Sequence, residues 1–126
     1  MQLLVDTDVM IDFLRGYPAA VNLIQQNSTK IALPAIVVAE LYAGVRNQSE
    51  QAVLDHLFEL FPVIPLSPEI AKTAGLLKRD YAKSHGTGLA DAVIAATAKN
   101  TQTKLTTLNT KHYPMFPNLA PAYKKT

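Results

Sequence analysis

The sequence predicts an α/β sandwich built on a mainly parallel sheet. Short apolar runs of strand-like character alternate with longer segments of helical periodicity along the 126 residues. The strand-like runs lack a polar face, as expected for strands that a parallel sheet buries on both sides. No repeat, linker or low-complexity segment interrupts this alternation. We therefore expect a single domain over residues 1–126.

In the first half of the chain, the predicted strands are residues 3–5 and 31–33, and the predicted helices are residues 9–14, residues 18–26 and a segment that starts at Pro34. The first helix is expected to end at the Arg15-Gly16 pair. Pro18 suits the first turn of the second helix, where a backbone N–H has no helical partner. The third helix carries Glu40.

In the second half, Ser49 is a candidate cap for a helix reaching residue 61, because its apolar residues follow the spacing of one buried face. Val63-Ile64 lies between two prolines, which restricts it to a short or edge strand. The run Ser67-Pro68-Glu69 predicts the start of a helix that ends near residue 83. The remaining predictions are a loop at 85–88, an alanine-rich helix at 89–99 and strands at 104–107 and 119–122.

Composition excludes several classes of protein. There are no cysteines, which rules out a disulfide scaffold, a thiolate metal site and a cysteine nucleophile. No apolar run approaches the roughly 20 residues of a membrane span, so we expect a soluble cytoplasmic protein with no membrane partner. The net charge of +2 is only mildly basic. Lysines gather after the last acidic residue, Asp91, and either hold a polyanion or form a solvated surface.

Three carboxylates, those of Asp6, Glu40 and Asp91, are each set in an apolar stretch. An ionised carboxylate is costly to bury unless its charge is compensated, and a shared divalent cation would compensate all three. In parallel sheets, ligand sites lie beyond the carboxyl ends of strands. Asp6 follows the first strand, and Thr107 and Asn109 follow a later one. The pattern therefore predicts a metal-dependent enzyme that acts on phosphate esters.

Four motifs occur in a characteristic order: Val5-Asp6-Thr7-Asp8-Val9, then Ala39-Glu40-Leu41-Tyr42-Ala43-Gly44, then residues 89–98 around Asp91, and finally residues 105–113 around Asn109. With these motifs the sequence resembles the PIN-domain nucleases, and especially the VapC-type toxins of bacterial toxin–antitoxin pairs. The resemblance covers nearly the whole chain. It implies a three-layer α/β/α sandwich with a mainly parallel sheet of about five strands.

The resemblance also implies an Mg²⁺- or Mn²⁺-dependent endoribonuclease whose partners are an RNA substrate, a cognate antitoxin and a second copy of the chain. Carried over by position, the catalytic and metal-binding residues are Asp6, Glu40 and Asp91, with Asp8 and Asn109 as further metal ligands. Asn109 stands where many members have a fourth acid. Thr7, Thr107 and Asn109 are expected to support the site, and Arg15, Arg46 and Lys111 to bind RNA.

Some of these residues also have simpler explanations. Asp8 suits the cap of a helix that begins one residue later, a role slightly favoured over metal binding. Asp12 and Arg15 are spaced to form an ion pair on one helix. Glu40 and Arg46 are six residues apart and do not share a helix face well.

Two alternative functions remain open at this stage. The missing fourth acid suits a catalytically silent PIN-fold domain that binds RNA or protein. The early Asp6-Thr7-Asp8 run resembles the start of haloacid-dehalogenase-type phosphatases, in which the first aspartate is a covalent nucleophile. The short chain and Met10 argue against the phosphatase.

Overall fold

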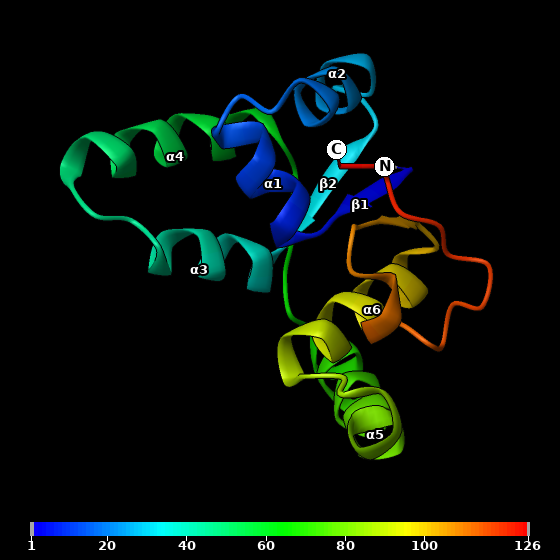
Figure 1. The fold of residues 1–126 in the computed structure, drawn as a ribbon. Coiled ribbons are helices and arrows are strands. Elements are labelled where there is room, and N and C mark those ends of the chain that lie inside the picture. Colours follow the sequence, from blue (N-terminus) through cyan, green and yellow to red (C-terminus); the bar gives the residue numbers. More distant parts are fainter. Residues whose placement is uncertain (1, 126) are drawn as a thin grey trace.

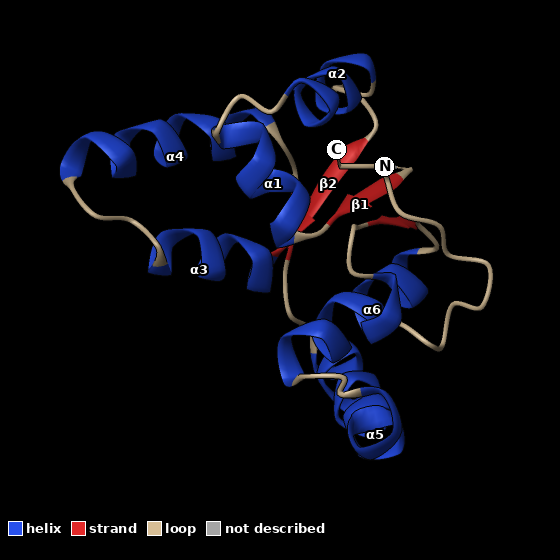
Figure 2. Ribbon diagram, viewed as in Figure 1, coloured by secondary structure: helices blue, strands red, loops and turns tan. Residues whose placement is uncertain are grey.

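Four parallel strands form a sheet in the order β3-β2-β1-β4 in the computed structural model, which describes residues 2–125. Figures 1 and 2 show β1 and β2 side by side. The strands are β1 (Leu3–Val5), β2 (Ile31–Pro34), β3 (Val63–Ile64) and β4 (Lys104–Thr106). The chain adds strands on one side of β1 and then returns to its other side with β4. The winding direction therefore reverses between β1 and β4, where parallel α/β sheets place their ligand sites.

Helices α1 and α2 lie to one side of the strands, and the packed pair α5 and α6 lies to the other (Figure 1). The helices are α1 (Thr7–Leu14), α2 (Pro18–Gln26), α3 (Ala35–Ala43), α4 (Gln48–Leu60), α5 (Pro68–His85) and α6 (Leu89–Thr101), with a 3-10 turn at Thr110–His112. This is the predicted α/β/α sandwich.

The core combines one fully buried strand with a helix whose middle turns are buried. All four residues of β2 are buried. In α6, every residue from Ala92 to Ala98 is buried. Four of those seven residues are alanines, whose small side chains let the helix approach its neighbours closely on all sides. The predicted alanine-rich helix is therefore confirmed, and its middle part belongs to the core.

Local signals place most helix boundaries. Ser67 Oγ accepts a hydrogen bond of 3.2 Å from the Ile70 N–H, so the predicted start of α5 is correct. The predicted cap of α4 is wrong: Asn47, not Ser49, accepts from the Glu50 N–H at 2.9 Å. An asparagine two residues earlier thus starts the helix earlier than the apolar pattern indicates.

The sheet has four strands rather than about five. Residues 119–122 form no strand, although the Ala122 N–H donates to the Thr107 carbonyl at 2.9 Å. Pro117 and Pro121 provide no N–H for a ladder, which explains why pairing stops at one bond. Within residues 2–125, no helix is both long enough and apolar enough to cross a membrane.

Candidate active site

Asp6 and Thr107 meet where β1 and β4 end side by side. Val5 pairs with Thr106 in the sheet, and the Asp6 N–H continues that register by donating to the Thr106 carbonyl at 3.0 Å. The next residue along each strand therefore faces the same edge. There Thr107 Oγ1 donates to Asp6 Oδ2 at 2.8 Å. Asp6 also caps α1, since its Oδ1 accepts from the Thr7 N–H at 2.7 Å.

Tyr113 links this pair to Asp91. Its hydroxyl donates to Asp6 Oδ2 at 2.8 Å and lies 3.4 Å from Asp91 Oδ1. Asp91 occupies the first turn of α6, where its Oδ2 accepts from the Gly88 N–H at 3.1 Å. His112 Nδ1 lies 3.4 Å from the same Oδ2. Two aspartates 85 positions apart in the printed sequence thus share one hydroxyl.

Asp8 joins the cluster through the loop after β4. Its Oδ2 accepts from the Leu108 N–H at 3.0 Å and lies 3.3 Å from Thr107 Oγ1. Its Oδ1 accepts from the Val9 N–H at 2.7 Å, inside α1. The prediction that Asp8 caps a helix starting at Val9 is therefore wrong, because the helix starts at Thr7 and Asp6 is its cap.

Glu40 approaches the cluster from α3 but is exposed to solvent. The buried residues of that helix are Val37 and Leu41, so Glu40 lies off the packed face despite its apolar neighbours. Thr7 Oγ1 donates to Glu40 Oε1 at 2.7 Å, which connects Glu40 to the start of α1. The premise that Glu40 is a buried carboxylate is thus wrong, because an apolar stretch in a helix exposes part of its circumference.

The electrostatics of the cluster are those of uncompensated negative charge. Burial raises the pKa of Asp6, hydrogen bonds from Tyr113 and Thr107 oppose that shift, and the nearby Asp91 charge adds to it. Burial also raises the pKa of Asp8 to about 6, with a further contribution from Asp6. Burial and the Asp6 charge raise the pKa of the Tyr113 hydroxyl, so that hydroxyl stays a neutral donor.

No Lys or Arg in the described chain forms an ion pair with any of the four acids Asp6, Asp8, Glu40 and Asp91. Their oxygens are hard donors of the kind that Mg²⁺ and Mn²⁺ bind, so the donor set fits such an ion. As the side chains stand, however, no group of three or more His, Asp or Glu residues between positions 2 and 125 is arranged to hold one. Their role as ligands stays a prediction.

Asn109 lies in the same loop, but its side-chain amide brings no negative charge to the site, as a fourth acid would. Its backbone N–H donates to Thr107 Oγ1 at 3.1 Å, and its side chain is exposed. The structure therefore shows Asn109 helping to fix the Thr107 hydroxyl. Lys111 is exposed in the following 3-10 turn, next to His112.

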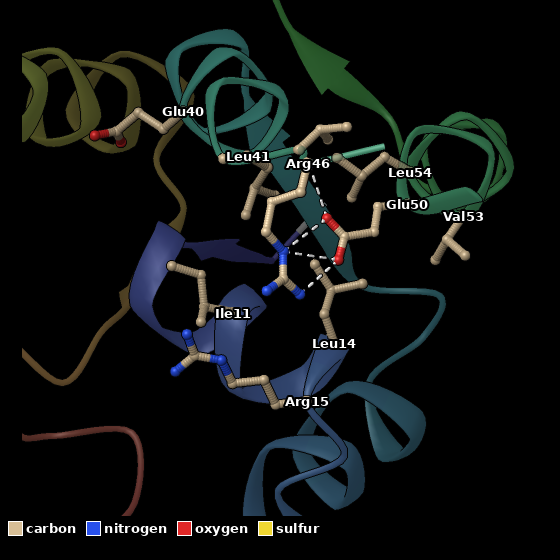
Figure 3. Close-up of a pocket in the computed structure, with 11 residues that line it drawn as sticks. Ile11, Leu14, Arg15, Glu40, Leu41, Arg46, Glu50, Val53 and Leu54 are labelled. Carbon is tan, nitrogen blue, oxygen red and sulfur yellow. Dashed lines mark hydrogen bonds and ion pairs between the residues drawn. The ribbon is translucent and has the colours of Figure 1, made fainter. Parts of the chain in front are cut away.

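A groove of about 570 Å³ opens beside Glu40, between α1, α3 and α4 (Figure 3). Arg15 and Arg46, both predicted to bind RNA, line it. Arg46 is already paired with Glu50 through Nη2 and Oε2 at 2.7 Å. The Glu40 carboxylate points away from that pair (Figure 3).

Asp12 is hydrogen-bonded to residues of the C-terminal segment. It is 4% exposed, and it accepts from the Tyr123 hydroxyl at 2.6 Å and from Lys125 Nζ at 2.8 Å. Burial by itself would raise the pKa of Asp12, but these two hydrogen bonds hold it below its ordinary value. The predicted Asp12–Arg15 ion pair is replaced by this contact, which also takes one lysine out of the basic C-terminal surface.

Sequence reasoning missed the role of Tyr113, which it included at the end of the last motif without assigning it a function. The tyrosine is 1% exposed, and its burial and hydrogen bonds show that this segment reaches the site. A large aromatic residue directly after a polar 3-10 turn was the available signal, but it does not reveal where the hydroxyl points.

The sequence and the fold are similar to those of known proteins. The family model of the PIN domain matches residues 3–115. The chain is 42% identical over 124 residues to ribonuclease VapC19 of Mycobacterium tuberculosis, covering 95% of this chain and 98% of the relative. Ribonuclease VapC10 of the same organism is 39% identical over 124 residues, covering 96% and 92%. A toxin–antitoxin complex from Klebsiella pneumoniae contains a chain of similar structure, with a TM-score of 0.84, 25% identity and coverage of 98% and 100%.

Proposed function

Because the chain belongs to the PIN-domain family, we propose that it is a metal-dependent endoribonuclease and the toxin of a bacterial toxin–antitoxin pair. The observation that carries the proposal is the convergence of Asp6, Asp91 and Thr107 at the point where the sheet reverses its winding. The relatives named as ribonucleases, and the structural neighbour named as a toxin–antitoxin complex, support the same reading. Family membership also argues against the phosphatase alternative.

The proposed metal-binding residues are Asp6, Asp91 and Glu40, with Asp8 and Asn109 as further oxygen ligands. A bound Mg²⁺ or Mn²⁺ would supply Lewis-acid polarisation of the phosphate and make water a better nucleophile. Thr107 and Tyr113 hold the Asp6 carboxylate in place through their hydroxyls. Thr7 does the same for Glu40.

RNA is expected to enter beside Glu40, where Arg15 and Arg46 line the groove. Lys111 is exposed next to His112, which contacts Asp91, and is proposed as a further phosphate contact. Positive side chains around an acidic centre would hold the phosphate backbone, because the acids alone repel it. We propose a cognate antitoxin and a homodimer as partners by analogy with the family. An RNA substrate makes the cytoplasm the expected place of action.

The test is RNA digestion by purified protein. Wild-type protein should cleave structured RNA in the presence of Mg²⁺ or Mn²⁺ and stop when EDTA is added. Asp6→Asn should be inactive while remaining folded, because asparagine is also a good helix cap. Absence of cleavage by the wild type, or equal cleavage by the variant, would contradict the proposal.

The toxin role needs a separate test in cells. Expression should arrest growth, and co-expression of the antitoxin encoded beside this gene should relieve the arrest. The exposed, uncharged Asn109 motivates one competing reading, a silent RNA-binding domain. RNA binding that is unchanged by metal and by Asp91→Asn would favour that reading.

A further inference from the structure

Tyr113 is the one buried tyrosine among residues 2–125, and its hydroxyl is aimed at two acids. Its main chain is anchored on both sides, since the Tyr113 N–H donates to the Thr110 carbonyl at 3.0 Å and the Phe116 N–H donates to the Tyr113 carbonyl at 3.0 Å. The preceding residue is also held, because Thr87 Oγ1 donates to the His112 carbonyl at 2.9 Å. The hydroxyl is therefore placed by the fold.

A phenolic hydroxyl has one proton to donate. The distances show that Tyr113 donates it to Asp6 Oδ2, at 2.8 Å, and keeps Asp91 Oδ1 close, at 3.4 Å. The same Asp6 oxygen also accepts from Thr107 at 2.8 Å. A carboxylate oxygen has about two lone-pair sites, so two hydroxyls fill the acceptor capacity of Asp6 Oδ2.

The two hydroxyls differ in the other acceptors that lie within their reach. Thr107 Oγ1 lies 3.3 Å from Asp8 Oδ2 and can turn its proton there. Tyr113 has no acceptor in the described structure except Asp6 and Asp91. A cation that binds Asp6 Oδ2 must therefore displace one of these two hydroxyls, and the tyrosine, unlike the threonine, can turn only to Asp91.

We propose that Tyr113 is a positioning residue that competes with the divalent cation for Asp6 and Asp91. It holds the two carboxylates together with a neutral donor and thereby weakens cation binding, so that the ion exchanges more readily. This inference rests on the proposed function, because it takes Asp6 and Asp91 as the metal ligands.

The competition predicts an unusual result for Tyr113→Phe. The phenyl ring keeps the packing, while Asp6 loses a donor and its repulsion with Asp91 is less relieved. Without added cation the variant should be less stable than the wild type. Its affinity for Mn²⁺ should nevertheless be higher, with a dissociation constant about tenfold lower, because a hydrogen bond to a charged group no longer has to be broken. A tyrosine that only supports the fold predicts unchanged or weaker binding.

The matched control is Tyr123→Phe. Tyr123 also donates to a buried aspartate, Asp12, at 2.6 Å. That aspartate is not among the proposed ligands. The control should lose stability in the same way but keep the wild-type Mn²⁺ affinity, measured for all three proteins by titration calorimetry.

A second readout needs no variant. The chain has five tyrosines and no tryptophan, so its near-ultraviolet absorption reports mainly on tyrosine. Adding Mg²⁺ to the wild type should give a tyrosine difference spectrum, because the Tyr113 hydroxyl loses its hydrogen bond to Asp6. The difference spectrum should vanish in Tyr113→Phe and persist in Tyr123→Phe.

The outcomes separate this inference from the proposed function. If the wild type binds Mn²⁺ and cleaves RNA, but Tyr113→Phe binds Mn²⁺ equally or more weakly, the competition is disproved and the nuclease assignment stands. A wild-type spectrum that Mg²⁺ leaves unchanged disproves it as well, even if the variant does not fold. If the wild type neither binds Mn²⁺ nor cleaves RNA, both proposals fail.

Discussion

Thr107 donates a hydrogen bond of 2.8 Å to Asp6 across a separation of 101 residues in the chain. This contact exists because β1 and β4 are neighbours in the sheet and end in register, with Val5 opposite Thr106. The Thr107 hydroxyl is completely buried, and it also accepts from the Asn109 N–H at 3.1 Å. One side chain thus connects the end of each strand with the loop that carries the last motif.

Replacement of Thr107 by valine should therefore damage both stability and activity. Valine has nearly the same shape but leaves the Asn109 N–H unpaired and removes a donor from Asp6. We expect a loss of about 1–3 kcal/mol in the free energy of unfolding, measured with urea, together with slower RNA cleavage. Thr107→Ser keeps the hydroxyl and should recover most of the activity. Equal activity of the valine and serine variants would show that the hydroxyl is not needed.

Substitution of Glu40, unlike that of Thr107, should reduce activity without reducing stability, because Glu40 is exposed. Glu40→Gln leaves the packing of Val37 and Leu41 intact and can still accept from Thr7. We expect a change in unfolding free energy within about 0.5 kcal/mol, as for other surface substitutions. RNA cleavage should nevertheless fall at least about tenfold to a hundredfold, the loss caused by removing even an outer partner of a metal site, because Glu40 is a proposed ligand. Asp55→Asn, an exposed acid on α4, should change neither quantity. Full activity of Glu40→Gln would remove Glu40 from the proposed site.

Asp12 provides a prediction about pH. Its pKa lies below the ordinary value of 3.8, so its ionised form stabilises the folded state. This contribution is complete above pH 3.8 and is lost as the pH falls through the lower pKa of the folded state. Asp12→Asn should therefore reduce the unfolding free energy by about 1 kcal/mol at pH 7, since it weakens the hydrogen bonds from Tyr123 and Lys125.

The difference between wild type and Asp12→Asn should remain constant from pH 7 to pH 5 and shrink below pH 3.8, as measured by urea unfolding at each pH. The titration of Asp6 and Asp8 affects both proteins alike and cancels in this comparison. A difference that grows as the pH falls would mean that Asp12 is not held ionised by its partners.

The fold could be predicted from the sequence largely because its signals are local. The apolar runs at residues 3–5 and 31–33, the Ser67-Pro68 start of α5 and the alanines of α6 each indicate their own structure, although β2 also includes Pro34, which was predicted to start the next helix. The predicted strand at 119–122 failed because strand pairing depends on a partner edge and on backbone N–H groups that Pro121 lacks.

The candidate site, like the fold, could be predicted from the sequence only in part. The positions of Asp6 and Thr107 follow from strand ends, which the sequence marks. The exposure of Glu40 and the burial of Tyr113 do not, because they depend on how a helix face and an irregular tail are packed by the rest of the molecule. Partners of charged side chains were also hard to predict: Asp12 is paired with Lys125, 113 residues away, rather than with nearby Arg15.

The groove beside Glu40 gives a last prediction, about RNA binding. Arg15 lines the groove without an ion pair in the described structure, whereas Arg46 is held by Glu50 at 2.7 Å. An arginine that is already neutralised by a carboxylate attracts a phosphate less. In an inactive Asp6→Asn background, Arg15→Ala should therefore weaken RNA binding more than Arg46→Ala does.

The salt dependence of RNA binding distinguishes a phosphate contact from a packing effect. Each lost contact with single-stranded RNA should reduce the slope of log K against log salt concentration by about 0.7. We expect this change for Arg15→Ala and not for Lys30→Ala, which removes an equal charge before the start of β2, at the opposite end of that strand from the site.

Glu50→Gln should strengthen RNA binding, because it releases Arg46 for the phosphate backbone. Weaker binding by Glu50→Gln would show instead that the Arg46–Glu50 pair is needed to shape the groove.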